Sequence, residues 1–501
     1  MRRRSNFRSD RGNSQPGASK LGNRPSSWYT VHDHKSPISI LPHPMRPNII
    51  LLVLDCVRFD GLHAFGNPRP VTPALDRLAE NSRRYTQARS AAIWTLPSHA
   101  SMFTGLHPRQ HGVNVETRWL DERIPTMAER LARAGYQTVA FSTNAWVGPH
   151  FGLDRGFEVF YALWRIFPGM GKAPFPWWEK ALRKGLLERS DKGARKLNAY
   201  LRTWWKTRRD PERPFFLFGL YLDAHLPYRP PKGYAERLLD RDALRRARAA
   251  NQDAWAYMAG EVSMTPEDFA GLRALYDAEI AYVDDMLADM LGFLDSAGAL
   301  EDTMVVVTAD HGENIGDHGL MDHQYCVCET LAHVPLIIHY PHALAPGDDD
   351  SPVQHTDLLP TFLDLAGAAP PASLTGRSLL ASSPATPPPQ IIQYTAPHRH
   401  RFARRHPGFD PASKGYDRTY DAFIQAGVKL IRSNRGDIWF YDLADDPGET
   451  VNLAAHRPQR VQDLTAALDA WLANHPPLIE AAPPPELDED LQKHLRGLGY
   501  L

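Results

Sequence analysis

The sequence predicts an α/β protein with a large, mostly parallel sheet flanked by helices and a small α+β domain at the C-terminus. Continuous apolar runs such as 48–54 and 215–222 are typical of parallel strands that are buried on both faces. Helical segments alternate with these runs, which is the order expected when helices cover both faces of a sheet. With 501 residues, the chain is long enough for one large domain and a smaller one.

The large domain is predicted to occupy residues 46–380. Its strands are expected at 48–54, 138–142, 215–222, 304–308 and 334–339. Its helices are expected at 73–82, from Thr95 onward, at 125–134, at 267–296 and at 356–365, with a polar helical insertion at 234–260. Thr72 and Thr265 are predicted N-caps, because each is followed directly by a proline, which suits the first turn of a helix.

A proline-rich linker at 382–390 leads to the small C-terminal domain, predicted at 390–485. Its strands are expected at 391–395, 420–425, 428–432 and 438–442, and its helix at 460–473. The middle two strands are predicted to form a hairpin across Ala426 and Gly427. A basic arm at 1–45 precedes the large domain and is expected to be disordered, and a tail at 486–501 ends the chain.

The composition argues against several kinds of partner and anchor. The 57 basic and 58 acidic residues give a formal net charge of −1, so no nucleic-acid partner is expected. No stretch has the apolar core of a signal peptide or the length of a membrane span, so a cytoplasmic location is expected. The 3 cysteines are too few for a disulfide framework, which agrees with a reducing compartment.

Residues 160–212 form a distinctive insertion that combines many aromatic side chains with many lysines and arginines. Core packing is one interpretation of the aromatic residues. A lid over the functional site, or a face that rests on lipid headgroups, are the others, so peripheral contact with a membrane remains open.

Thr95 is the first candidate functional residue. It stands two residues before Pro97 and opens a predicted helix, where we expect it to act as the cap. A hydroxyl there lies near free backbone N–H groups and the positive end of the helix dipole, where anions bind and an alkoxide forms more easily. The alternative is a capping threonine without further function.

Polar side chains also follow the predicted strands directly. They are Asp55, Asp223 with His225, and Asp310 with His311. In open α/β sheets this carboxyl edge is where ligands bind. Carboxylate oxygens and imidazole nitrogens suit a divalent cation, and a cation that touched the Thr95 hydroxyl would help to ionise it.

Four ordered motifs resemble the sulfatase branch of the alkaline phosphatase superfamily. They are the strand that ends in Asp55, TLPSHASMFTGLHPRQHG, TADHGENIGDHG and YDLADDPGETVNL. The resemblance extends from about Asn48 to about Leu453. It implies an alkaline-phosphatase-like α/β domain with a small C-terminal sheet domain and a single divalent metal ion at the edge of the main sheet.

The resemblance implies roles for individual residues. By position, Asp55, Asp310 and His311 match the family's metal ligands. Thr95 matches the nucleophile, which also touches the metal ion.

Four further residues are candidates for contact with the substrate or for catalysis. His225 matches a histidine that contacts the bound ester and is a candidate to protonate the leaving group. His323 lies near a position where relatives keep a substrate-binding Lys or His. Arg58 could pair with the anionic ester, and a surface ion pair is the alternative. His99 stands where sulfatases have an arginine.

Thr95 also marks a departure from true sulfatases. They have Cys or Ser at this position, which is oxidised to formylglycine, and threonine cannot give that aldehyde. A covalent Thr95 ester must therefore be released by attack of water or an acceptor alcohol on the central atom, which phosphorus tolerates readily. The sequence thus favours phosphate or phosphonate esters over sulfate.

Cys56 and His311 are a second departure. Sulfatases that bind Ca often have Asp and Asn at these positions, and the pattern here is more similar to phosphonate monoester hydrolases and phosphodiesterases. Cys56 itself is interpreted as a buried neutral residue. Loss of a carboxylate and gain of an imidazole favour Mn or Zn, with Ca or Mg as the alternatives.

The predicted function is that of a sulfatase-family, metal-dependent hydrolase, or a transferase, that acts on small anionic phosphate, phosphonate or sulfate esters through a covalent Thr95 intermediate. Three alternatives are a true sulfuric ester hydrolase that works without formylglycine, a catalytically inactive anion-binding scaffold, and a membrane-surface transferase of phosphoglycerol or phosphoethanolamine groups.

Overall fold

The computed structural model describes residues 46–164, 191–382, 384–398 and 404–480, together with Phe402, Glu489, Leu491, Gln492 and Leu495. The basic arm at 1–45, residues 165–190 of the aromatic insertion and most of the C-terminal tail lie outside the described residues. Among the residues described, no helix is both long and apolar enough to cross a membrane.

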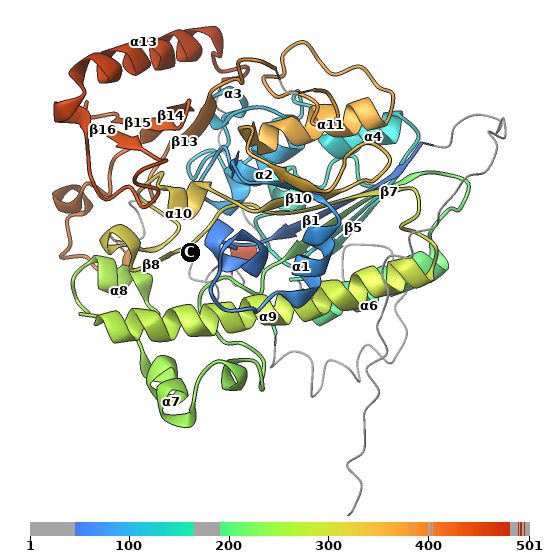
Figure 1. The fold of residues 1–501 in the computed structure, drawn as a ribbon, viewed down its shortest axis with the longest axis horizontal. Helices are drawn as coiled ribbons and strands as arrows, with labels where there is room; N and C mark the ends of the chain where they lie inside the picture. The colour runs from blue at the N-terminus through green and yellow to red at the C-terminus, as the bar shows by residue number, and fades with distance from the viewer. Residues whose placement is uncertain are drawn as a thin grey trace, which may run out of the picture. The chain divides into compact units, whose positions relative to one another are not determined.

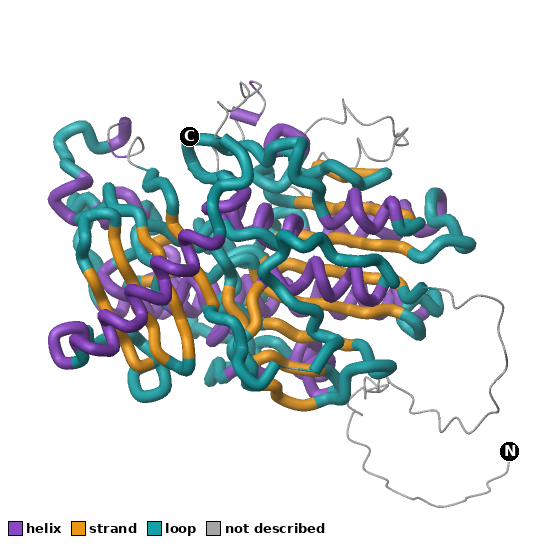
Figure 2. Tube along the Cα trace, turned by 90° about the horizontal axis from the view of Figure 1, so that it is seen from above, coloured by secondary structure: helices purple, strands orange, loops and turns teal. Residues whose placement is uncertain are grey.

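The large domain is built on an eight-stranded sheet with the order β11-β2-β10-β7-β1-β6-β4-β5 (Figures 1 and 2). The strands are β1 (Asn48–Leu54), β2 (Arg83–Tyr85), β4 (Gln137–Ser142), β5 (Val159–Ala162), β6 (Phe215–Tyr221), β7 (Thr303–Ala309), β10 (Leu336–His339) and β11 (Gly347–Asp349). Neighbouring strands are parallel except at β10, which runs antiparallel to both β7 and β2. The predicted mostly parallel sheet is therefore confirmed. The reversal of β10 and the short strands β2 and β11 were not foreseen.

Two groups of helices cover the two faces of this sheet (Figure 1). One group is α1 (Pro73–Glu80), α6 (Ala194–Thr207) and α9 (Pro266–Ser296), and the other is α2 (Thr95–Thr104), α4 (Met127–Arg133) and α11 (Leu358–Leu365). Shorter helices are α3 (Pro108–His111), α7 (Arg241–Ala249), α8 (Ala254–Met258) and α10 (Glu329–Ala332). Two small sheets pair β3 (Ala88–Arg89) with β12 (Val353–Gln354) and β8 (Asn314–Ile315) with β9 (Met321–Asp322). Single 3-10 turns occur at Phe59–Gly61, His63–Phe65, Pro149–Phe151, Ala235–Arg237, Asp317–Gly319, His355–Asp357, Pro411–Lys414 and Ala454–His456.

The helix starts follow the predicted caps only in part. Thr265 caps α9 by accepting a hydrogen bond from the Asp268 N–H at 3.2 Å. Thr95 is instead the first residue of α2 and Trp94 takes the cap position, so the prediction that Thr95 caps this helix is wrong. The helix begins before Pro97 because the first four N–H groups of a helix have no partner within it, so a proline costs no hydrogen bond there.

The start of α1 is capped from another helix. Thr72 makes no side-chain cap; the backbone N–H groups of Ala74 and Leu75 each donate to the Asp284 carboxylate of α9 at 2.8 Å. We expect Asp284→Ala to lower the free energy of unfolding by about 1–2 kcal/mol, the usual worth of an N-cap. Urea unfolding of Asp284→Ala and of Asp295→Ala, an exposed carboxylate on the same helix, measures this. Equal losses in the two variants would contradict the assignment.

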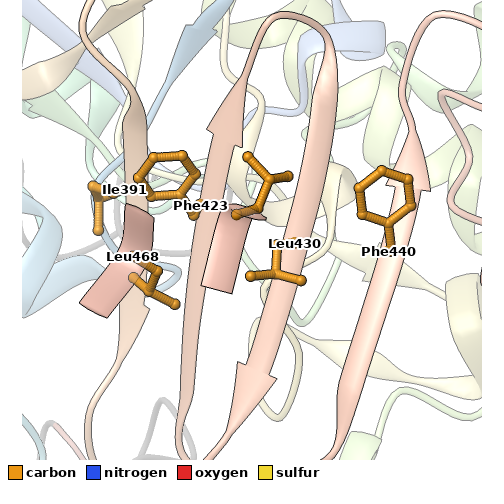
Figure 3. Close-up of a cluster of buried hydrophobic side chains, with 6 residues drawn as sticks. Ile391, Phe423, Leu430, Phe440 and Leu468 are labelled. Carbon is orange, nitrogen blue, oxygen red and sulfur yellow. The ribbon is translucent and has the colours of Figure 1, made fainter. Parts of the chain in front are cut away.

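The C-terminal domain is a four-stranded antiparallel sheet with one helix packed on it. Its elements are β13 (Gln390–Tyr394), β14 (Tyr420–Gln425), β15 (Val428–Ser433), β16 (Ile438–Asp442) and α13 (Pro458–Asn474). Ala426 and Gly427 form the predicted hairpin turn, with φ of 51° and 77° that match a type I′ turn. The core between the sheet and α13 consists of Ile391, Phe423, Leu430, Phe440, Leu464 and Leu468 (Figure 3).

The described part of the 160–212 insertion is folded into the large domain. It contributes β5 and α6, and Trp164 and Trp204 are 7% and 0% exposed. These positions support core packing for the two tryptophans.

Candidate active site

The candidate site lies where the three central strands end together. In the β1–β6 and β1–β7 registers, Leu54 pairs with Tyr221 and with Ala309. The residues that follow these three strands therefore lie at one edge of the sheet. They include Asp55, Asp223 and Asp310, and all three are buried. The carboxyl edge of the sheet thus gathers side chains from distant parts of the chain, as the 254 positions between Cys56 and Asp310, which are hydrogen-bonded there, show.

Three electron-pair donors converge at this edge. The Thr95 Oγ1 atom, in the first turn of α2, lies 3.4 Å from His311 Nε2. His311 Nε2 lies 3.3 Å from Asp310 Oδ2. Ligand atoms bound at about 2.0–2.1 Å to one tetrahedral cation are about 3.4 Å apart, so these spacings fit a shared metal ion.

Asp310 is held in a fixed orientation by its neighbours. Its Oδ1 atom accepts the backbone N–H of Cys56 at 3.2 Å and that of His311 at 2.9 Å. Its Oδ2 atom, the one that faces His311, accepts no hydrogen bond from the described residues although it is buried. A buried carboxylate oxygen in this position is suited to a cation.

Asp55, which follows β1, is the fourth candidate metal ligand. Its Oδ2 atom accepts from Asn144 Nδ2 at 2.5 Å, and its Oδ1 atom accepts from the Cys56 thiol at 3.1 Å. The candidate ligand atoms of Asp55, Cys56 and His311 all lie within 4.8 Å of one another. The predicted ligands Asp55, Asp310, His311 and Thr95 are therefore brought together.

The tautomer of His311 is set by its own backbone neighbourhood. Its Nδ1–H donates to the Gly312 carbonyl at 2.8 Å, which leaves the lone pair on Nε2 facing Thr95 and Asp310. Residue 312 must be glycine, because a Cβ there would lie 2.0 Å from the Thr330 carbonyl oxygen.

Burial dominates the electrostatics of this cluster. Burial, reinforced by the Asp310 charge, raises the pKa of Asp55 to about 7, and burial raises the pKa of Asp310 to about 7. Burial and the neighbouring His323 lower the pKa of His311 to about 3, which keeps this imidazole neutral and able to bind a metal ion.

A second group of side chains lies beside the first. His323 Nδ1 contacts Asp322 Oδ1 at 2.9 Å and Glu313 Oε1 at 3.2 Å. Burial opposes the charge, but these two carboxylates raise the pKa of His323 well above its usual value. Its ring centroid is 4.4 Å from that of His311 and 5.2 Å from that of His225. A cationic imidazole next to the donor cluster is suited to an anionic ligand.

The contacts of two candidate residues, Arg58 and His99, favour roles other than binding the ester. The Arg58 guanidinium pairs with Asp60 at 2.7 Å and Asp317 at 2.7 Å and donates to the Glu313 carbonyl, so the ion-pair interpretation is favoured over ester binding. His99 Nδ1–H donates to the Thr95 carbonyl at 2.8 Å, and its ring packs between Phe103 and Phe218. Its Nδ1 atom lies 3.6 Å from Asp310 Oδ2, so His99 is suited to hold that carboxylate in position.

Three residues that support the site were not among those predicted from the sequence. Asn144, which follows β4, holds Asp55, and Glu313 holds His323. Lys192 Nζ donates to the Glu279 carboxylate at 2.6 and 2.8 Å, to the Asp223 carbonyl at 2.9 Å and to the His225 carbonyl. Asn144 obeys the same strand-end rule and could have been found by it. Lys192 and Glu313 lie outside any strand end.

The fold and site together define an alkaline-phosphatase-like ester hydrolase. The chain belongs to the sulfatase family, whose model matches residues 47–368, and a model of the C-terminal part of N-sulphoglucosamine sulphohydrolase matches residues 316–475. The arylsulfatase of Clostridium perfringens is 26% identical over 457 residues, which cover 82% of this chain and 90% of that protein. The multifunctional alkaline phosphatase superfamily protein PehA of Trinickia caryophylli is 23% identical over 501 residues, with 86% and 96% covered. Among solved structures, the phosphonate monoester hydrolase of Agrobacterium radiobacter superposes with a TM-score of 0.68 at 22% identity, over 86% of this chain and 96% of that one.

Proposed function

We propose that this chain is a metal-dependent hydrolase of phosphate or phosphonate esters in which Thr95 is the nucleophile. One observation supports this most directly. Thr95 Oγ1, in the first turn of α2, and Asp310 Oδ2 lie 3.4 and 3.3 Å from His311 Nε2. A capping role does not explain Thr95, because Trp94 occupies the cap position.

Members of the sulfatase family are metal-dependent, and the residues present here fit one divalent cation. Asp55, Asp310, His311 and Thr95 would hold it. When bound, it would supply Lewis-acid chemistry, by polarising the ester and lowering the pKa of a hydroxyl that it touches. The mixed oxygen and nitrogen donors suit Mn²⁺ or Zn²⁺ better than Ca²⁺ or Mg²⁺, which prefer oxygen ligands.

Thr95 Oγ1 attacks phosphorus in line with the leaving oxygen. The bond from Thr95 Oγ1 to phosphorus forms as the bond to the leaving oxygen breaks, and the Thr95 hydroxyl proton ends on the leaving oxygen. Water then cleaves the covalent ester at phosphorus, and one of its protons returns to Thr95 Oγ1. The first turn of α2 presents N–H groups that have no partner within the helix, so the attack takes place where anionic charge is stabilised.

The two histidines beside the cluster take different parts in this proposal. The imidazolium of His323, fixed by Asp322 and Glu313, binds a non-bridging oxygen of the ester. Burial lowers the pKa of His225 to about 3, and its Nδ1–H donates to the Leu226 carbonyl. His225 therefore starts neutral, so we assign it contact with the bound ester and not protonation of the leaving group in the first step.

A sulfuric ester hydrolase is the second candidate, because the relatives named above include an arylsulfatase. Threonine cannot become formylglycine, so a sulfated Thr95 would have to be released by attack at sulfur. We therefore expect phosphodiesters and phosphonate monoesters to be the better substrates.

The experiment compares turnover of aryl phosphodiester, aryl phosphonate and aryl sulfate by the full chain with Mn²⁺ or Zn²⁺, together with its metal content. Asp310→Asn is expected to weaken metal binding at least about 100-fold, since even residues that only orient a ligand cost 10–100-fold. Asp302→Asn, an exposed carboxylate just before the other end of β7, is the control and should bind like wild type.

Each other outcome overturns part of the proposal. Turnover of the sulfate ester alone would select the second candidate. Equal metal content in wild type and Asp310→Asn would remove Asp310 from the metal site. Absence of both metal and turnover would leave an anion-binding scaffold.

A further inference from the structure

A second cluster of metal-ligating side chains lies outside the candidate active site. The candidate ligand atoms of His318, Cys328 and Glu449 are all within 4.8 Å of one another. Cys326, two residues before Cys328, is hydrogen-bonded to the Cys328 thiol. We call these four residues the thiol cluster.

The thiol cluster is assembled from three separate segments. His318 is in the 3-10 turn between β8 and β9, and the two cysteines lie between β9 and α10. Glu449 comes from the C-terminal domain, in the turn after β16. The cluster thus offers two sulfurs, an imidazole and a carboxylate. These groups are typical ligands of a tetrahedral cation.

The Cys326 sulfur is held by hydrogen-bond donors. It accepts from the Cys328 thiol and from Asn314 Nδ2, the latter at 3.6 Å. Asn314 is itself oriented by Thr330, whose Oγ1 donates to Asn314 Oδ1 at 2.7 Å. The sulfur therefore has a positioned amide donor, as metal-bound thiolates commonly do.

A buried ion-pair network fixes the orientation of Glu449. Lys429 pairs with Glu449 at 2.9 Å and with Glu329 at 2.8 Å, and Arg89 pairs with Glu329 at 2.7 Å. The Glu449 carboxylate is therefore held beside Cys328 and His318.

We propose that Cys326, Cys328, His318 and Glu449 form a second metal site that takes a borderline-soft divalent cation, with the chemistry of Zn²⁺. Binding releases the protons of the two thiols to solvent and forms two metal–sulfur bonds, without change of oxidation state. The site is distinct from the one at Asp55 and Asp310. Its metal ion would join the loop that carries His323 to the C-terminal domain.

The test uses the full chain, reduced, stripped of metal and reloaded with Zn²⁺ or Co²⁺. His318→Asn is the main variant, because His318 is exposed and asparagine tolerates its φ of 54°. His456→Asn, at another exposed histidine, is the matched control. We expect His318→Asn and Cys328→Ser to bind one equivalent of Zn²⁺ fewer than wild type and His456→Asn.

The Co²⁺ form identifies the ligands without any need for turnover. Wild type and His456→Asn should show thiolate-to-cobalt charge-transfer absorption in the near ultraviolet, which Cys328→Ser should lose. Zn²⁺ should also slow alkylation of Cys326 and Cys328, and a chelator should restore it.

Three results would overturn the proposal. One is an unchanged zinc stoichiometry in His318→Asn. The second is absorption that survives Cys328→Ser and disappears in Cys56→Ser, which would assign the thiolate to the edge of the main sheet. The third is an intramolecular Cys326–Cys328 disulfide that re-forms in air in zinc-loaded protein. Because these readouts do not depend on turnover, failure of the proposed hydrolase function would leave the result interpretable.

Discussion

Thr95→Ala is expected to lower kcat on a phosphorus ester by about a thousandfold to a millionfold, the range found when the nucleophile of a covalent mechanism is removed. The variant should fold normally, since Thr95 is buried but small and its carbonyl, which accepts from His99, is unchanged. It should also retain much of its metal, because Asp55, Asp310 and His311 remain. Steady-state kinetics and metal analysis of the same preparation separate loss of the nucleophile from loss of the site.

The covalent intermediate provides a direct check on this prediction. Rapid quenching of wild type during turnover should give a peptide containing Thr95 with the mass of the transferred group, and Thr95→Ser should give the same adduct on serine. Thr104→Ala, at the last residue of α2, is the control, because Thr104 Oγ1 bonds to nearby backbone: it donates to the Ala100 carbonyl at 2.6 Å and accepts from the Leu106 N–H at 3.3 Å. Wild-type kcat in Thr95→Ala would exclude Thr95 as the nucleophile.

Lys429→Met is expected to lower the free energy of unfolding by about 3–5 kcal/mol, as removal of one partner from a buried ion pair does. Lys429 is fully buried on β15, where it donates to the Val327 carbonyl at 2.6 Å and pairs with Glu329 and Glu449. In the variant, Glu329 and Glu449 stay buried but lose the cation that pairs with both. Urea unfolding measures the loss.

A more exposed ion pair between another residue of β15 and α13 is the control for Lys429. Arg432 pairs with Asp469 at 2.6 Å near the surface, and Arg432→Met should cost less than about 1 kcal/mol. The pH dependence has a definite sign. Burial opposes ionisation of Glu329, but Arg89 and Lys429 hold its pKa far below its usual 4.5, so its contribution is present at neutral pH and is lost as the pH falls below that value. The prediction would be contradicted if acidification lowered the free energy of unfolding of wild type no more than that of Lys429→Met.

The strands and the site ligands at their ends could be predicted because both depend on local patterns. Apolar runs marked β1, β6 and β7, and the residue after each run placed Asp55 and Asp310 at one edge. The start of α2 was misjudged because proline is tolerated at several positions in a first turn, so the cap position is not fixed by the sequence. The reversal of β10 depends on which neighbours it meets, which no local pattern specifies.

The supporting residues were missed for a related reason. Lys192 lies in a region whose composition suggested only an insertion, and its four acceptor atoms come from two other segments. Arg58 carries the charge that an anion site would use, but the carboxylates that bind it are set by tertiary structure. Charge is visible in the sequence, while the partner of a charge is not.

The strand order at the centre of the sheet also constrains how the protein is made. β1 pairs with β6 and β7, yet Asn48 and Phe215 are 167 positions apart, and Cys56 and Asp310 are 254 apart. During synthesis, the run of apolar residues in β1 must therefore wait through more than half of translation before both of its edges are covered. Long delays of this kind expose aggregation-prone segments, so we expect the nascent chain to depend on chaperones until β7 has left the ribosome.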